Sequence, residues 1–299
     1  MPEGPEVRVM TDQLWSLISK KPVLKSFQVI SGRYTRHPFP NLEKFQSLLP
    51  LEINGVKCHG KLIYWQFKSA DRADLELGGN PWFLLNTLGM SGRWSLTKET
   101  HAHIEITLSV REDNLVECEK GVDDVDDLTM WFCDPRHFAT LTLTQEPAVR
   151  MKRIGPDWLA EPPPSLELLK SKFLEKQQRS RVDQTLPKLL MDQSIFSGCG
   201  NYLKSEVLYR ARLSPFRTPD TLLDEEWERL YNEMVLTIRE SYSANGTTLA
   251  TYASPDGKTG SYFQQLRVYN KRVDPEGREI VKIETPDKRT THWVPGYQI

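Results

Sequence analysis

The stretch that decides the fold of the second half of the chain is "PKLLMDQSIFSGCGNYLKSEVLYRARL", residues 187–213. Apolar residues recur at helical spacing on both sides of its centre, so we predict two helices with a short connection. The first helix takes in Leu186, Leu189, Leu190 and Met191, and the second takes in Tyr202, Leu203, Val207 and Leu208. The segment "SGCGN" (197–201) joins them.

The connection between these helices can be read in two ways. Gly198 and Gly200 permit backbone conformations in which amide groups converge on an anion, and Asn201 stands where the second helix begins. Such an arrangement would bind a phosphate. A plain helical hairpin would account for the same residues.

The first half of the chain is rich in short β-type runs. An apolar stripe predicts a helix over residues 7–18, and strands are predicted over 23–30, 61–67, 82–90, 103–110, 130–134 and 138–144. Prolines then collect over 146–165, where the strand pattern stops. Helices follow over 165–177 and 224–244, and two strand-like runs about a turn end the chain over 278–296. The fold class is therefore α+β, with an N-terminal β-sandwich that carries a helix and a mostly helical second part.

We place domain boundaries at 1–147, 148–245 and 246–299. The 299 residues suffice for two cores, and 38% hydrophobic with 26% charged residues is ordinary for a globular protein. No stretch is long enough to span a membrane and no secretory signal opens the chain, so we expect an intracellular protein. The net charge of −1 hides an acidic run over 112–127 and basic segments later in the chain.

The cysteines indicate neither a disulfide framework nor a zinc site. Cys58, Cys118, Cys133 and Cys199 lie far apart, without a Cys-x-x-Cys pair. His101 and His103 could share one face of a strand, but a lone His-x-His is more often exposed or hydrogen-bonded than metal-bound. We therefore expect no metal and no cofactor.

The opening "MPEGPEV" (1–7) carries a reactive group if the initiator Met is removed. Pro2 then becomes a free secondary amine, and Glu3 and Glu6 stand beside it. The structural alternative is an ordinary helix start, since proline suits the first turn and carboxylates suit the positive end of the helix dipole.

Three further features bear on this choice. Met90 lies between glycines in "LGMSGRW", and Arg136 and Phe138 lie two apart in "DPRHFAT". Apolar wedges beside an arginine can fill the gap left when a base leaves the DNA stack, although each side chain could also serve a core. Lys61 precedes an apolar strand in "HGKLIYWQF".

Together these motifs resemble the superfamily of formamidopyrimidine-DNA glycosylases and endonuclease VIII (Fpg/Nei), which are bifunctional DNA glycosylases and AP lyases. The resemblance covers nearly the whole chain, and "PEGPEV" favours the endonuclease VIII branch over the "PELPEV" usual in the formamidopyrimidine branch. It implies a helix-two-turn-helix motif over the stretch quoted first.

The resemblance also implies roles for the residues singled out above. Pro2 matches the nucleophile that forms a Schiff base with C1′, and Glu3 matches the residue that moves protons in sugar opening and elimination. Glu6 matches a supporting carboxylate, and Lys61 matches a lysine that contacts a phosphate and assists catalysis. Asn201 matches the asparagine that binds the DNA backbone. Met90, Arg136 and Phe138 match the residues that fill the void.

The C-terminal segment departs from the commonest pattern of the superfamily. Many members end in a four-cysteine zinc finger, but no cysteine follows Cys199. The segment "RTTHW" (289–293) instead resembles the zincless finger of endonuclease VIII-like enzymes from animals and giant viruses. Arg289 then matches the arginine at the finger tip, which reaches DNA and acts in the second elimination.

The function implied is base-excision repair of oxidised bases by a Schiff base and β,δ-elimination. Expected substrates are oxidised pyrimidines and hydantoins; because residues 247–269 resemble a loop that caps 8-oxoguanine, that lesion and formamidopyrimidines stay open. Expected partners are double-stranded DNA with oxidised bases or abasic sites, with single-stranded DNA also open, and the chain is expected to be a monomer. The alternatives are a catalytically inactive helix-two-turn-helix protein that binds damaged DNA, and a tautomerase-like enzyme using its terminal proline as a base.

Overall fold

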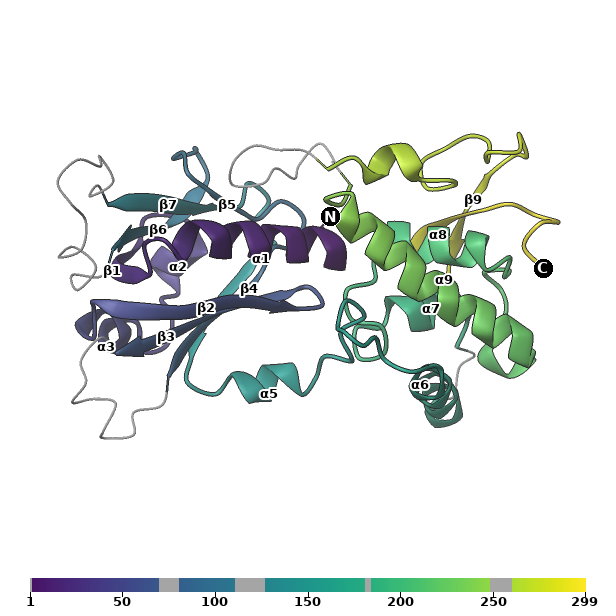
Figure 1. The fold of residues 1–299 in the computed structure, drawn as a ribbon, viewed down its shortest axis with the longest axis horizontal. Helices are drawn as coiled ribbons and strands as arrows, with labels where there is room; N and C mark the ends of the chain where they lie inside the picture. Colours follow the sequence, from purple (N-terminus) through teal and green to yellow (C-terminus); the bar gives the residue numbers. More distant parts are fainter. Residues whose placement is uncertain (1, 70–80, 111–126, 181–183, 248–259) are drawn as a thin grey trace. The chain divides into compact units, whose positions relative to one another are not determined.

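The structure is a computed structural model that describes residues 2–69, 81–110, 127–180, 184–247 and 260–299. The chain divides into two compact units (Figure 1). The first comprises residues 1–2, 7–149 and 248–259, and the second comprises 3–6, 150–247 and 260–299. Cys118, nearly all of the acidic run and most of the stretch resembling a capping loop lie outside the described residues.

In the described part of the first unit, eight strands form one antiparallel sheet with the order β5-β7-β6-β1-β2-β3-β4-β8. The strands are β1 (Val23–Val29), β2 (Leu51–His59), β3 (Leu62–Ser69), β4 (Trp82–Thr87), β5 (Arg93–Ser95), β6 (Ala102–Ser109), β7 (Leu128–Cys133) and β8 (Thr140–Thr144).

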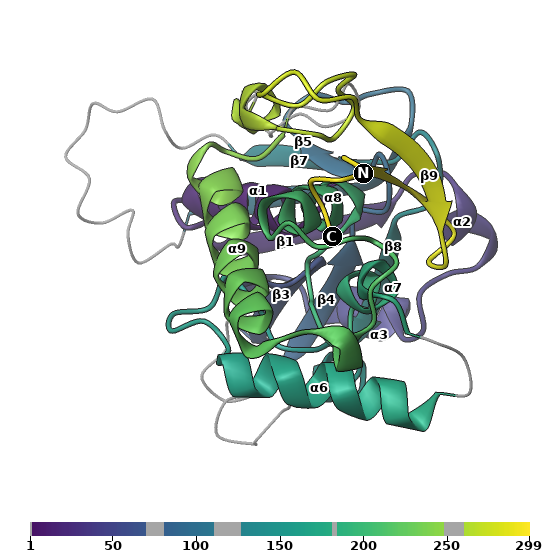
Figure 2. The same cartoon turned by 90° about the vertical axis from the view of Figure 1, so that its right-hand side faces the viewer.

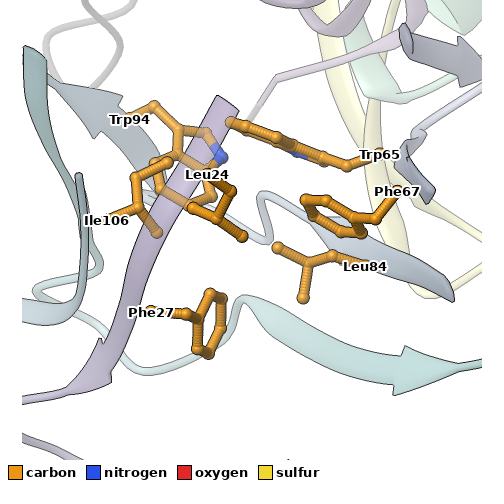
Figure 3. A pocket seen from close by; sticks show the side chains of 7 residues that line it. All are labelled: Leu24, Phe27, Trp65, Phe67, Leu84, Trp94 and Ile106. Carbon is orange, nitrogen blue, oxygen red and sulfur yellow. The ribbon is translucent and has the colours of Figure 1, made fainter. Parts of the chain in front are cut away.

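This sheet curls so that its two halves pack face to face. Trp65 on β3 and Trp94 on β5 are separated by four strands in the sheet, yet their ring centroids lie 4.7 Å apart. Figure 3 shows side chains from both halves around one small space in this core, with Leu24, Ile106 and Trp94 from one half and Trp65, Phe67 and Leu84 from the other. The predicted α+β fold is confirmed, and its two layers belong to a single hydrogen-bonded sheet.

Helix α1 (Gly4–Ile18) supplies the predicted apolar stripe. Val7, Met10, Leu14 and Ile18 are buried in the core of the first unit. The first turn of α1, up to Glu6, groups with the second unit. Two short helices, α2 (Arg33–Arg36) and α3 (Leu42–Ser47), follow β1 and were not predicted.

The strand predictions are wrong in detail: β2 and the short β5 were not predicted, and one predicted strand is too long. Strand β2 was missed because a bulge between Ile53 and Gly55 breaks the alternation that sequence reading depends on. The strand predicted over 82–90 ends at Thr87, because Gly89 turns the chain with a φ of +59°.

The second unit is mainly helical (Figure 2). Its elements are α6 (Leu166–Arg179), α7 (Leu186–Met191), α8 (Asn201–Arg210), η2 (Pro219–Thr221), α9 (Asp224–Ser243) and η3 (Tyr262–Gln265), and α5 (Pro147–Met151) precedes them. Phe173, Leu190, Tyr202 and Trp227 are among the side chains of its core. The two helices predicted from the stretch 187–213 are confirmed as α7 and α8.

The chain ends in the predicted hairpin of β9 (Val281–Thr285) and β10 (Arg289–Trp293). The strands pair antiparallel, with Arg289 opposite Thr285 and Trp293 opposite Val281. Within the described ranges, no helix has the length and apolar character needed to cross a membrane.

Candidate active site and DNA-binding residues

The carboxylate of Glu3 is bound by the backbone at the start of α8. The amide of Gly200 donates to Oε2 at 2.7 Å, that of Tyr202 to Oε1 at 2.9 Å and that of Leu203 to Oε2 at 3.3 Å. Glu3 is only 2% exposed. Three amides and the positive end of a helix therefore hold this carboxylate in place.

The glycine-rich connection makes this approach possible. Any side chain at Gly200 would collide with the carboxyl group of Glu3, and one at Gly4 would press on the backbone of Gly198. The amide of Gly4 donates to the Gly198 carbonyl at 2.8 Å. The amide of Gly198 in turn donates to the side chain of Gln193 at 3.1 Å. The Gly200 amide, one of the groups that the sequence suggested for binding an anion, binds the carboxylate of the protein's own Glu3.

Glu6 is the centre of a second buried set of hydrogen bonds. Its Oε2 accepts from the Glu3 amide at 2.8 Å, and its Oε1 accepts from the Tyr202 hydroxyl at 3.0 Å. The amide and hydroxyl of Thr247 donate to the same Oε1, at 2.7 and 3.1 Å. Burial, followed by the charge of Glu6, raises the pKa of Tyr202 well above its usual value. Glu6 thus fixes the backbone of Glu3.

Tyr202 and Thr247 were not identified as site residues from the sequence. Tyr202 was read as a core residue, which it also is, since its ring belongs to the core of the second unit. Its hydroxyl lies 2.9 Å from that of Ser241 on α9. A buried tyrosine needs a hydrogen-bond partner for its hydroxyl, and this requirement could have identified Tyr202 as a site residue from the sequence.

Pro2 groups with the first unit, and the chain joins it directly to Glu3.

Asn201 and Arg289 line one cavity of about 500 Å³ in the second unit. Asn201 Nδ2 donates to the Thr290 carbonyl at 2.9 Å, and its Oδ1 has no hydrogen-bond partner in the described structure. Lys282 and Lys288 line the same cavity and add positive charge. The structure therefore brings to one cavity Asn201, which was predicted to bind the DNA backbone, and Arg289, which was predicted to reach DNA and act in the second elimination. Their motifs lie 88 positions apart, at 201 and 289.

His292 also lines this cavity and was not predicted as a site residue. It is 3% exposed, and neither ring nitrogen has a hydrogen-bond partner in the described structure. Burial lowers its pKa to about 4, and the charges of Lys282 and Lys204 act in the same direction. The imidazole is therefore neutral at physiological pH.

Met90, Arg136 and Phe138 belong to two loops of the first unit that are tied together. Ser91 Oγ donates to Asp134 Oδ1 at 2.7 Å and accepts from the Arg136 amide at 3.2 Å. Asp134 Oδ2 accepts from the backbone amide just after Phe138, also at 2.7 Å. The Arg136 guanidinium lies 5.6 Å from the centroid of the Phe138 ring, which is 57% exposed. An exposed aromatic ring held beside a cation fits a wedge better than a core residue.

Lys61 lies in the turn between β2 and β3 and is half-buried. Cys58, Cys133 and Cys199 are buried, and burial raises the pKa of Cys133 to about 11. His103 is hydrogen-bonded, with its ring nitrogens 3.1 Å from Ser31 Oγ and from the Asp134 carbonyl. Among the residues that the structure describes, no three His, Cys, Asp or Glu side chains are grouped to hold a metal ion.

The first unit is β-rich and carries an N-terminal helix, and the second unit is helical and binds Glu3 at the start of α8. The N-terminal domain model of formamidopyrimidine-DNA glycosylase matches residues 1–141, and the H2TH domain model of the same enzyme matches residues 159–253. The chain belongs to the formamidopyrimidine-DNA glycosylase (Fpg) family, and it is an enzyme of DNA repair.

Relatives and solved structures agree with this membership along the full chain. Formamidopyrimidine-DNA glycosylase from Exiguobacterium sp. is 28% identical over 306 residues, covering 100% of this chain and 99% of the relative. The crystal structure of the MutM (Fpg) protein from Thermus thermophilus has a TM-score of 0.75 at 27% identity and covers 99% of this chain and 98% of that one. Lactococcus lactis Fpg in complex with DNA containing an abasic site has a TM-score of 0.76 at 22% identity, with 99% of each chain covered.

The expected superfamily is therefore confirmed. The relatives and structures named here carry the formamidopyrimidine name, whereas the endonuclease VIII branch and the zincless-finger type stay predictions.

Proposed function

We propose that this chain is a bifunctional DNA glycosylase and AP lyase that removes oxidised bases from double-stranded DNA and nicks the strand. The observation that supports it best is the Glu3 carboxylate, held by three backbone amides one residue from the nitrogen of Pro2. A fixed, ionised carboxylate beside a terminal amine is what proton transfer during sugar opening requires.

The chemistry begins once Met1 has been removed. A terminal amino group titrates near pH ~8, so a useful fraction of the Pro2 amine is neutral at physiological pH. Its lone pair attacks C1′ of the damaged nucleotide, and the base leaves with the electrons of the glycosidic bond and takes a proton from water. The Glu3 carboxylate accepts the proton that the Pro2 nitrogen loses after the attack, and it passes this proton to the sugar oxygen as the C1′–O4′ bond breaks. The nitrogen lone pair then forms the second bond to C1′, so the nitrogen becomes an iminium ion.

The iminium ion then acts as an electron sink for strand cleavage. Removal of a proton from C2′ expels the 3′ phosphate in the β-elimination. A second elimination, with Arg289 near the phosphate, expels the 5′ phosphate. Lys61 contacts a phosphate close to the lesion.

Base extrusion costs a few kcal/mol of unstacking, and wedge residues must offset it. Met90, Arg136 and Phe138 fill the space left by the base, with Arg136 facing the orphaned partner. Asn201 and Arg289 bind the DNA backbone, so affinity falls steeply as salt rises.

Borohydride trapping on DNA with an abasic site tests the proposal. Borohydride reduces the iminium ion and links the protein covalently to DNA, so trapping is expected with Pro2 at the terminus. An uncleaved N-terminal tag should abolish it, and the same preparation after cleavage to expose Pro2 is the matched control. Efficient trapping with the tag in place would contradict the role of Pro2.

A panel of lesions distinguishes the remaining possibilities. Oxidised pyrimidines, hydantoins, 8-oxoguanine and formamidopyrimidines should be compared in duplex and single-stranded oligonucleotides. Cleavage of at least one lesion is expected. Tight binding to damaged duplex without any nick would instead identify an inactive damage-binding protein.

A further inference from the structure

The C-terminal hairpin needs some means of fixing its turn, because Arg289 lies directly after it. No cysteine follows Cys199 in the sequence, and in the described part of the chain no group of side chains suits a metal ion. The residues of this hairpin therefore do not fit the four-cysteine zinc site of many family members.

A buried ion pair links this turn to α8. Lys204 Nζ on α8 lies 2.7 Å from Asp287 Oδ2 in the turn, and the two side chains are 0% and 4% exposed. The charge of Asp287 and its hydrogen bond oppose the effect of burial, which lowers the pKa of Lys204. Neither group is available to solvent, so the pair is part of the interior of the second unit.

The other oxygen of Asp287 extends the link into both strands. Thr285 Oγ1 on β9 donates to Asp287 Oδ1 at 2.5 Å. The same hydroxyl lies 2.7 Å from Thr291 Oγ1 on β10 and 3.1 Å from the carbonyl oxygen of Arg289. The Asp287 carboxylate thus links α8 to Thr285 at the end of β9, and the Thr285 hydroxyl continues the link to the start of β10. Lys288, with a φ of +58°, is held between these contacts.

The helix that receives this link also binds Glu3. The amides at the start of α8 hold the Glu3 carboxylate, and Asn201 Nδ2 holds the Thr290 carbonyl. Glu3 and the turn before Arg289 are therefore both bound to α8, a helix of ten residues (Asn201–Arg210).

We propose that Lys204 and Asp287 are positioning residues that set the place of Arg289 relative to Glu3. This inference rests on the proposed function, because Arg289 acts in the second elimination. Net stability alone explains the pair poorly, since a buried ion pair is often no more stabilising than apolar residues of similar volume. The contacts of the pair instead favour a role in fixing the geometry of the turn before Arg289.

The test compares variants that remove the link without leaving an unpaired charge. Lys204→Met/Asp287→Asn removes both charges and keeps an oxygen for Thr285. Lys204→Arg is the conservative rescue, and Lys170→Met is the matched control, because Lys170 pairs with Asp224 at 2.8 Å on the surface. The measurements are the rate of borohydride trapping, the ratio of β,δ- to β-elimination products, and amide hydrogen exchange over residues 281–293.

The double variant should trap within about twofold of the wild type, whereas its δ-elimination product should fall about tenfold or more, as in Arg289→Ala. Hydrogen exchange in the hairpin should rise about tenfold. Adding Arg289→Ala should cause no further loss, since the pair acts through that residue. Lys204→Arg should recover most of the product ratio, and Lys170→Met should change nothing.

An unchanged product ratio, unchanged exchange, or losses that add to those of Arg289→Ala would each overturn the inference. If the wild type itself neither traps nor nicks, the proposed function is wrong. Hydrogen exchange still decides in that case whether the pair fixes the turn, because it does not depend on activity.

Discussion

Replacing Gly200 with alanine should displace the Glu3 side chain without changing any other functional group of the site. The backbone at Gly200 is extended, with φ −134° and ψ −159°, so alanine introduces no strain there. Its Cβ would lie 2.7 Å from Glu3 Cγ and nearer still to the carboxyl carbon, where contacts below 3.4 Å are already tight. Clearing Cγ alone, from 2.7 to 3.4 Å, requires the Glu3 side chain to move by about 0.7 Å, and the nearer carboxyl group requires a larger movement.

The cost of this movement follows from the hydrogen bonds that it weakens. A shift of that size stretches the 2.7 Å bond from the Gly200 amide towards the limit of a hydrogen bond. Bonds to charged groups contribute about 1.5–3 kcal/mol each, and the shifted carboxylate keeps some of them, so the free energy of unfolding should fall by about 1–3 kcal/mol. Because a misplacement of about 1 Å can cost about 100-fold in rate, excision should slow by about that factor.

Thermal unfolding and single-turnover nicking of a lesion-containing duplex measure the two effects of Gly200→Ala. Gly55→Ala is the control, because an added Cβ there meets nothing closer than 3.8 Å. A Gly200→Ala enzyme that nicks at the wild-type rate would refute the reasoning that these amides position a catalytic carboxylate.

Three further substitutions have defined outcomes. Tyr202→Phe removes the hydroxyl bound to Glu6, so the free energy of unfolding should fall by about 1–3 kcal/mol in urea titrations. His292 has a folded pKa of about 4 against 6.5 ordinarily, so the unfolded chain takes up a proton that the folded chain does not. The contribution of His292 to the free energy of unfolding should therefore be fully present above pH 6.5, and up to about 3 kcal/mol of it should be lost as pH falls to 4. His292→Phe should remove this part of the pH dependence of unfolding. Asp134→Asn weakens the link between the loops of Ser91 and Phe138, so base excision should slow about tenfold, whereas trapping on an abasic site, where no base needs extrusion, should change less. Equal losses in the two assays would contradict that role.

The sequence by itself determined most of the helices and several of the strands, and it indicated the candidate reactive groups. The spacing of apolar residues placed α1, α7, α8 and α9, because a helix buries one face at a fixed period. The hairpin at the end of the chain was also predicted. The short motifs named the family, since they record which residue types stand at each place.

Only the tertiary structure decided which of these groups meet. Glu3 lies 197 residues from the Gly200 amide that binds it, and Lys204 lies 83 residues from Asp287. No periodicity encodes such partners, because periodicity reports which face of an element is buried and not what buries it. The curled sheet that brings Trp65 to Trp94 is a consequence of the same kind, since strand order and twist, rather than the pattern of any one strand, determine which faces pack together.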